Sequence, residues 1–234
     1  RLGVAAVADL PGVGENLVDH VWVSVDVPAR TGLPPGPLAQ TVITMHSRDA
    51  DRHGPPDLHV VPCSVISDDS SPTGARLFVG VSVIKPRSRG RLWLDSTDPE
   101  AKPRVAPGYF TDPSDMVRAI EGIVAARTLL RTPPLSDLVA GPELTPAPGV
   151  SDDDTAGLAA GIRAAHGTYY HQAGTGRMGP DPDAGDVVDA RGAVFGVDGL
   201  FVADASIMPT IPSANTNLPT IMIGERIAAF MRDS

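Results

Sequence analysis

The sequence predicts a mixed α/β (α+β) fold, because the spacing of its apolar residues changes partway along the chain. Before residue 95 of the 234-residue chain, short runs rich in Val and Phe are bounded by Pro and Gly, a pattern typical of β-strands. After residue 112, apolar residues recur at helical spacing behind residues that favour helix N-termini. Strands and helices are mixed throughout, and the sequence has no internal repeat.

The predicted strands begin in the first half of the chain. Residues 77–84 are the most convincing strand, because they are rich in Val and end before Pro86. Residues 91–94 are predicted to be the hairpin partner of this strand, across the Arg/Ser/Gly turn between them. Residues 28–37 carry Pro and Gly and are predicted to form a loop. Shorter strands are predicted at 4–8, 22–27, 41–45 and 57–61.

A first helix is predicted to start at Asp112 or Ser114 and to run to about Arg131. Asp and Ser are favoured helix caps, and the Pro pair at 133–134 stops the helix. Its apolar residues fall near one face, which indicates the side that packs on the rest of the protein. These residues are Met116, Ile120, Ile123, Val124 and Leu130.

Two more helices are predicted after a Pro-rich linker at residues 141–149. The acidic run 151–154 opens the first of them, since the helix dipole favours acids in the first turn. Pro219 opens the last helix, which is predicted to run to about Met231. Between them, residues 200–203 are predicted to be a strand that ends at Asp204. The apolar positions of the earlier helix are Leu158, Ile162 and Ala165.

Charge and composition exclude several classes of protein. The formal net charge of −9 argues against a nucleic-acid-binding face, which needs clustered positive charge. No uncharged apolar run is long enough to span a bilayer, so we expect no integral membrane segment. The single cysteine, Cys63, cannot form an internal disulfide or a multi-thiolate metal site.

His171 is the first candidate for a chemical role. It lies among aromatic residues and glycines, which allow a backbone to approach a ligand closely, and an imidazole can take a proton near neutral pH. A half-buried histidine beside a turn explains the same residues, and on the residues alone this plainer interpretation is favoured.

Two further candidates precede or follow predicted elements. Asn215 lies just before the last predicted helix, where free N–H groups and the helix dipole favour an anion or an electron-rich ring edge. Asp204 ends a predicted strand, a place where carboxylates often accept ligand hydroxyls. The plainer interpretation is capping: by Asn217 or Thr216 at the helix, and by Asp204 at a turn.

Other motifs are rejected on physical grounds. The string Gly174-x-Gly176-x-x-Gly179 matches a dinucleotide fingerprint, but a Pro/Asp/Gly turn follows it instead of the helix that would hold a pyrophosphate. The remaining histidines lack metal-ligand spacing, so we assign no metal. The serines lack the context of a hydrolase nucleophile.

Three segments resemble the glucose-methanol-choline (GMC) family of FAD-dependent oxidoreductases, in the order and spacing of the C-terminal half of that family. The first is the Asp-Leu-Pro-Gly-Val-Gly-Glu-Asn-Leu-Val-Asp-His run at 9–20. The second joins 86–92 to 112–115. The third joins 171–179 to 202–210 and 215–220.

The resemblance implies two interleaved domains. Residues 1–20 and 166–234 would belong to the FAD-binding domain, and residues 21–165 to an antiparallel-sheet substrate domain. The chain begins at Arg1 with the pattern of a domain interior, so we expect a fragment that lacks the N-terminal dinucleotide-binding half. Alone it should bind FAD weakly or not at all and should need a companion N-terminal half. The location stays open at this point, with the cytoplasm favoured.

The resemblance also implies a reaction. The family oxidises small-molecule alcohols with FAD, so that a neutral His171 would accept the hydroxyl proton and Asn215 would donate a hydrogen bond to the developing alkoxide. A lyase of the same fold, and a non-catalytic truncated chain or subunit, are the alternatives. The residues that match cofactor-binding positions are Asp204, Ala205, Thr216, Asn217 and Leu218.

Overall fold

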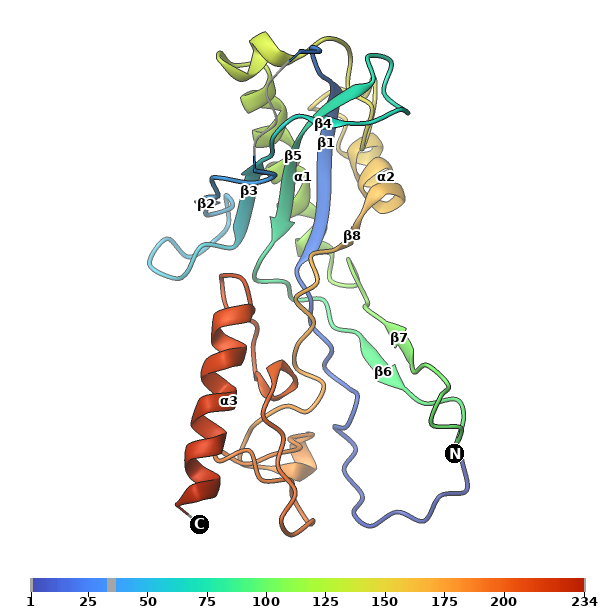
Figure 1. Cartoon of the computed structure of the whole chain (residues 1–234), viewed down its shortest axis with the longest axis vertical. Coiled ribbons are helices and arrows are strands. Elements are labelled where there is room, and N and C mark those ends of the chain that lie inside the picture. Colours follow the sequence, from blue (N-terminus) through green and yellow to red (C-terminus); the bar gives the residue numbers. More distant parts are fainter. Residues whose placement is uncertain (1, 33–36, 234) are drawn as a thin grey trace. The chain divides into compact units, whose positions relative to one another are not determined.

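The computed structural model describes residues 2–32 and 37–233, and the chain divides into two compact units that interleave along the sequence (Figure 1). Unit 1 consists of Arg1–Asp19, Pro86–Thr111 and Tyr170–Ser234, and unit 2 of His20–Lys85 and Asp112–Tyr169. Residues 86–111 thus fall in unit 1, whereas the predicted division placed them in the middle domain. The assignment of the units to cofactor and substrate stays a prediction.

Unit 2 is built on an antiparallel sheet in the order β2-β3-β5-β1-β8, with β4 paired to β5 (Figure 1). The strands 22–27, 41–45, 57–61 and 77–84 are confirmed with shifted ends. Of the predicted loop 28–37, residue 28 belongs to β1, and 33–36 lie outside the described residues. The strands are β1 (Val21–Pro28), β2 (Ile43–Met45), β3 (Leu58–Pro62), β4 (Ile66–Ser67), β5 (Ala75–Val83) and β8 (Gly167–Thr168).

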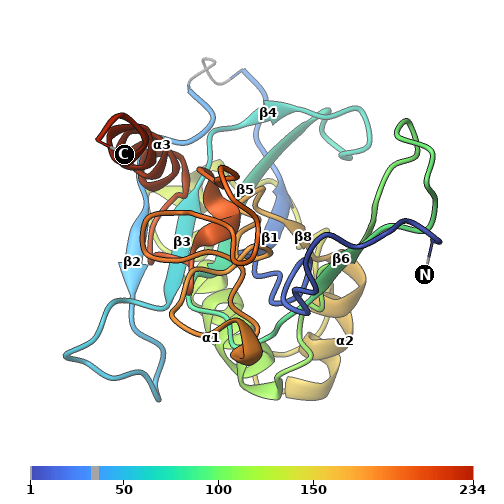
Figure 2. The same cartoon turned by 90° about the horizontal axis from the view of Figure 1, so that it is seen from below.

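Alternation along β1 and β5 produces the core of unit 2. Val23 pairs with Val81 and Val25 with Val79, and all four side chains are buried. The helices α1 (Pro113–Leu130) and α2 (Thr155–Ala165) pack on the sheet and on each other (Figure 2). A Cβ on Gly122 of α1 would lie 2.3 Å from a Val81 methyl group, so the missing side chain allows this close approach.

Trp22 needs the absence of a side chain at Gly80, its neighbour on the adjacent strand. A Cβ on Gly80 would lie 1.9 Å from the Trp22 ring, which also packs on Tyr169 at a centroid distance of 4.7 Å. We therefore expect Gly80→Ala to lower the free energy of unfolding by about 1–3 kcal/mol, the usual cost of overpacking. Denaturant unfolding followed by tryptophan fluorescence measures it.

Gly167→Ala is the matched control, because Gly167 pairs with Trp22 from the strand on its other side, but a Cβ added there would meet no atom within 4 Å. This control is expected to change stability by less than about 0.5 kcal/mol, as for a surface substitution. Equal losses in the two variants would contradict the packing argument.

The caps at the helix starts follow from the sequence. Asp112, and not Ser114, caps α1, because its side chain accepts a hydrogen bond from the Ser114 N–H. Asp154 caps α2 in the same way through Gly157. The helix α3 (Asn217–Arg232) starts two residues before the predicted Pro219. In the part of the chain that the structure describes, no helix combines the length and apolar composition needed to cross a membrane.

Three local predictions are wrong. Residues 91–94 do not pair with β5, whose two edges are taken by β1 and β3; instead β6 (Arg91–Trp93) pairs with β7 (Arg104–Ala106) in unit 1. Residues 4–8 form no strand: they pair with no described strand, and Val4 and Val7 are 72% and 86% exposed. Residues 200–203 contribute only an isolated bridge between Ala193 and Phe201.

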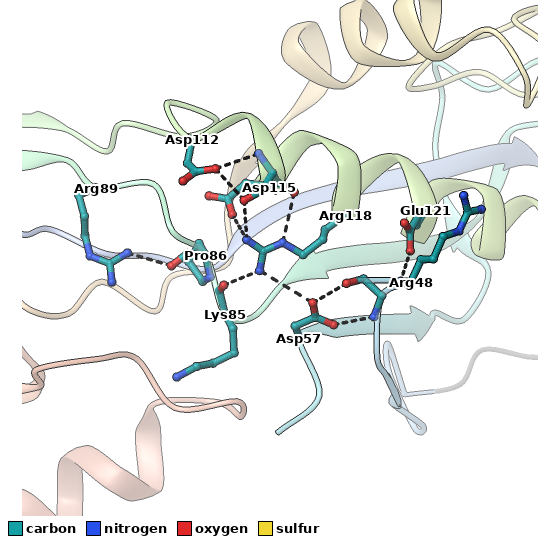
Figure 3. Close-up of polar contacts among 11 residues, drawn as sticks. Arg48, Asp57, Lys85, Pro86, Arg89, Asp112, Asp115, Arg118 and Glu121 are labelled. Atoms are coloured by element: carbon teal, nitrogen blue, oxygen red, sulfur yellow. Dashed lines mark hydrogen bonds and ion pairs between the residues drawn. The ribbon is translucent and has the colours of Figure 1, made fainter. Parts of the chain in front are cut away.

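Polar contacts connect α1 to the loop before β3 and to the residues that follow β5 (Figure 3). Arg118 bonds to Asp115 and donates a 2.6 Å hydrogen bond to the Lys85 carbonyl. Asp57 accepts hydrogen bonds from the backbone N–H and the hydroxyl of Ser47, at 2.7 and 2.6 Å. These contacts fix the point at which the chain leaves unit 2.

Candidate active site

Three segments that are far apart in the sequence meet in unit 1. Val18 and Ala173 exchange backbone hydrogen bonds of 2.9 and 2.8 Å, which join residues near 18 to those near 173. On the other side, the N–H groups of Gly174, Gly176 and Met178 donate to the carbonyls of residues 205–207. The segment that follows His171 is therefore held between two others.

Glycine is required where these segments come closest. Gly174 has φ +88°, in the left-handed region that favours glycine, and a Cβ there would lie 2.6 Å from the Asn16 carbonyl oxygen. The Asn16 side chain donates a further hydrogen bond to the Gly174 carbonyl. The glycines near His171 thus allow close backbone contact. As predicted, no α-helix directly follows residues 174–179; the next element is a three-residue 3₁₀ turn at Pro182–Ala184.

The structure brings the two predicted catalytic residues together. His171 is 8% exposed, and its Nε2 lies 3.3 Å from Nδ2 of the exposed Asn215. With the amide nitrogen of Asn215 as the donor, Nε2 accepts through a lone pair, as in the tautomer that carries its proton on Nδ1. The imidazole that fits this geometry is the neutral form, with its unprotonated nitrogen facing Asn215.

Burial favours the same protonation state. Desolvation lowers the pKa of His171 below its ordinary value, and the nearby negative charge of Asp19 partly opposes that shift. His171 therefore stays neutral down to a lower pH than an exposed histidine does. A neutral imidazole with a lone pair on one ring nitrogen is suited to accept a proton.

Asp19 is a residue of the site to which the sequence assigned no role. Its carboxylate is 4% exposed and accepts hydrogen bonds from the His171 N–H at 2.9 Å, from the Gln172 side chain at 3.1 Å and from the Tyr109 hydroxyl. The partners lie 90 and more residues away along the chain, so no local spacing could have indicated this cluster.

The predicted cofactor residues lie in two places of unit 1. Asp204 is exposed and caps the 3₁₀ turn η3 (Ala205–Ile207) through a 2.8 Å hydrogen bond from the Ser206 N–H. Ala205 is half-buried, and its carbonyl accepts from the Gly174 N–H. Both residues therefore lie beside the segment that carries His171.

The other predicted cofactor residues form the start of α3. Thr216 is the N-terminal cap residue but makes no side-chain hydrogen bond to the helix, in contrast to Asp112 and Asp154. Asn217 and Leu218 are exposed, Leu218 by 75%. The plainer interpretation, that Thr216 caps the helix with its side chain, does not describe this end.

Metal and thiol chemistry find no support in the described residues. Within 2–32 and 37–233, no group of three or more His, Cys, Asp or Glu side chains could hold a metal ion. Cys63 is buried, which raises the pKa of its thiol to about 11. The thiol thus stays protonated near neutral pH and is a poor nucleophile.

Comparison with known proteins gives a consistent set of relatives. The 5-(hydroxymethyl)furfural oxidase of Methylovorus sp. (strain MP688) is 37% identical over 244 residues, covering 97% of this chain and 44% of that protein. Choline oxidase of Arthrobacter globiformis is 37% identical over 240 residues, covering 99% and 43%. The crystal structure of pyridoxine 4-oxidase from Mesorbium loti superposes with a TM-score of 0.86 at 28% identity, covering 99% of this chain and 46% of that chain.

The architecture is that of the C-terminal part of an oxidoreductase with a mixed helix and antiparallel-sheet fold, which confirms the predicted fold class. The profile of the GMC oxidoreductase family matches residues 86–224, more than half of the chain. The chain therefore belongs to the GMC oxidoreductase family, as its motifs predict. It spans slightly less than half the length of the curated relatives it matches.

Proposed function

We propose that this chain supplies the proton-accepting part of an FAD-dependent enzyme that oxidises an alcohol to an aldehyde or ketone. One observation carries the proposal: Nε2 of the buried His171 lies 3.3 Å from the side-chain amide of the exposed Asn215. An alcohol whose oxygen displaces this contact, within hydrogen-bond distance of both groups, could give its proton to His171 and accept a hydrogen bond from Asn215.

The residues present fit a flavin beside this pair. The start of α3 has no side-chain cap, so its first N–H groups and its dipole are available to an electron-rich ring edge. Thr216, Asn217 and Leu218 would lie along the ring, and Asp204 and Ala205 nearer the ribityl chain. When bound, FAD would take up the hydride that leaves the substrate carbon.

The names of the relatives support the substrate class. Proteins similar to this chain are named as oxidases of 5-(hydroxymethyl)furfural and choline and as an alcohol dehydrogenase. We infer a small-molecule alcohol as the substrate. His171 would hold the hydroxyl proton, while Asn215 would stabilise the oxygen as negative charge develops on it.

We also propose that a companion N-terminal segment covers part of unit 1. Ile221 and Met222 lie one helical turn after Leu218 on α3 and are 54% and 58% exposed. Large apolar side chains grouped on one helix face usually mark a contact surface. The relatives are more than twice as long as this chain, so their remaining length could supply such a cover.

Flavin reduction tests the proposed reaction. The complete protein, purified with its flavin, is mixed with alcohols in the absence of oxygen, including choline and 5-(hydroxymethyl)furfural. We expect at least one alcohol to bleach the visible flavin absorbance and to yield the aldehyde or ketone. A flavin that is reduced by dithionite but by no alcohol would reject alcohol oxidation and favour the lyase alternative.

A further inference from the structure

We propose that Asp19 is the positioning residue of the site: it holds the His171 peptide in place and stabilises the protonated imidazole during turnover. The inference rests on the proposed function of His171 as proton acceptor. It assigns a role to a carboxylate that touches no reacting atom. The proposal rests on three hydrogen bonds that Asp19 accepts, on the strained backbone at Tyr170 and on the negative charge of Asp19.

The hydrogen bonds tie Asp19 to the backbone of His171 and to the side chains of two neighbours. Oδ1 accepts from the His171 backbone N–H at 2.9 Å, and Oδ2 accepts from the Gln172 amide at 3.1 Å and from the Tyr109 hydroxyl. The adjacent Val18 and Ala173 exchange two backbone hydrogen bonds. The carboxylate therefore extends this pairing to the residue that carries the imidazole.

The backbone just before His171 is strained, and the hydrogen bond to Asp19 helps to keep it in this conformation. Tyr170 has φ +62°, a left-handed conformation that costs a non-glycine residue of order 1–3 kcal/mol and persists only where neighbours enforce it. The peptide that follows Tyr170 carries the N–H bonded to Asp19. A charged acceptor makes a stronger hydrogen bond than a neutral one, so Asp19 helps to retain this turn.

The charge of Asp19 also acts on the imidazole. Asp19 is buried, so its negative charge is weakly screened and favours the protonated form of His171. Burial of His171 acts in the opposite direction and is the larger effect. The base is thus neutral before the reaction, while the imidazolium formed by proton transfer has a counter-charge nearby.

Other polar groups around His171 are also relevant to its titration. Tyr109 is titratable and bonds to Asp19, and Asn215 faces the ring without charge. Glu15 and Arg89 lie on neighbouring segments, with Arg89 bonded to Asn16. Asp204 caps η3. Asp19 bonds to the His171 peptide itself.

Asp19→Asn in the complete protein tests the proposal, since asparagine keeps the size and one oxygen acceptor but loses the charge. We expect kcat to fall on the order of 10-fold, because both positioning and charge are weakened, while KM changes by less than about twofold. The acid limb of the kcat/KM profile should move to lower pH, because loss of the negative charge lowers the pKa of His171. Nuclear magnetic resonance titration of the His171 ring should show the same downward movement.

Tyr109→Phe is the matched control, because it removes one hydrogen bond to Asp19 but keeps the charge. Its His171 titration should stay at the wild-type position. A His171 titration that is unmoved or moves upward in Asp19→Asn would overturn the proposal. A structural role alone would lower the rate without moving the titration.

A second measurement needs no variant. In the wild-type protein, the amide hydrogen of His171 is expected to exchange at least about 10-fold more slowly than an unprotected amide, since it is bonded to a buried carboxylate. Unprotected exchange at His171, with the Ala173 amide protected, would overturn the proposal even if Asp19→Asn does not fold. Both readouts follow His171 itself, so a failure of the alcohol oxidation would be seen separately.

Discussion

Replacing His171 by alanine in the complete enzyme is expected to lower turnover at least about 100-fold, the scale on which a positioned general base acts. The residue lies in contact with Asn215, and its neutral form is favoured by burial. Flavin content should stay near that of the wild type, because the predicted cofactor contacts lie on other residues. Steady-state kinetics, together with anaerobic flavin reduction by the alcohol, measure the loss.

The direction in which kcat/KM changes with pH follows from the role of His171. His171 must be neutral to accept a proton, so the wild-type kcat/KM should rise with pH as His171 loses its proton. Because burial lowers the pKa of His171, this rise should lie below the range of an ordinary histidine. His53→Ala is the control, since His53 is exposed and its hydrogen bond to Asp51 is made by the backbone N–H. Unchanged turnover in His171→Ala would remove His171 from this role.

Replacing Arg127 by methionine is expected to lower the free energy of unfolding by about 3–5 kcal/mol, the usual cost of breaking a buried ion pair on one side. Arg127 is buried on α1, where it bonds to both oxygens of Glu143 at 2.7 and 2.9 Å and to Asp152 at 2.8 Å. Its other N–H groups donate to the Val150 and Ala147 carbonyls. The bonds to Glu143 raise the pKa of Arg127, which keeps it charged.

Arg131→Ala is the control for this prediction. Arg131 also bonds to Asp152, but its side chain is 63% exposed, so its loss should cost about 1 kcal/mol or less. The pKa of Asp152 is lowered, first by Arg131 and then by Arg127, so its contribution is present at neutral pH and is lost as the pH falls below the ordinary aspartate range. If Arg127→Met and Arg131→Ala unfold at similar urea concentrations, the large contribution of Arg127 to the free energy of unfolding is contradicted.

Local signals predicted the helices well because their causes are local. Asp112 and Asp154 cap α1 and α2 within a few residues of the positions they stabilise. Strand pairing depends on distant neighbours, so the sequence assigned residues 91–94 to the wrong partner. Residues 4–8 have strand-forming composition, but the structure gives them no strand to pair with.

The candidate site also combines features with a local signal and contacts between distant segments. On their own, the residues around His171 favoured an ordinary histidine; the family resemblance singled it out, and the structure places Asn215 beside it. Asp19 was not found, because its contacts join segments 90 to 153 residues apart. Such a carboxylate has no spacing signal that one sequence could reveal.

The interleaving of the two units has a consequence for synthesis on the ribosome. Val18 is made before its backbone partner Ala173, which is added about 150 residues later. The pairing of Val18 with Ala173 must therefore wait until all of unit 2 is translated, and Ile227 of the unit 1 core comes later still. Long-range closure of this kind slows folding and leaves apolar surface exposed. Until α3 has emerged, Val187 and Ile207 of the unit 1 core lack their packing against Ile227.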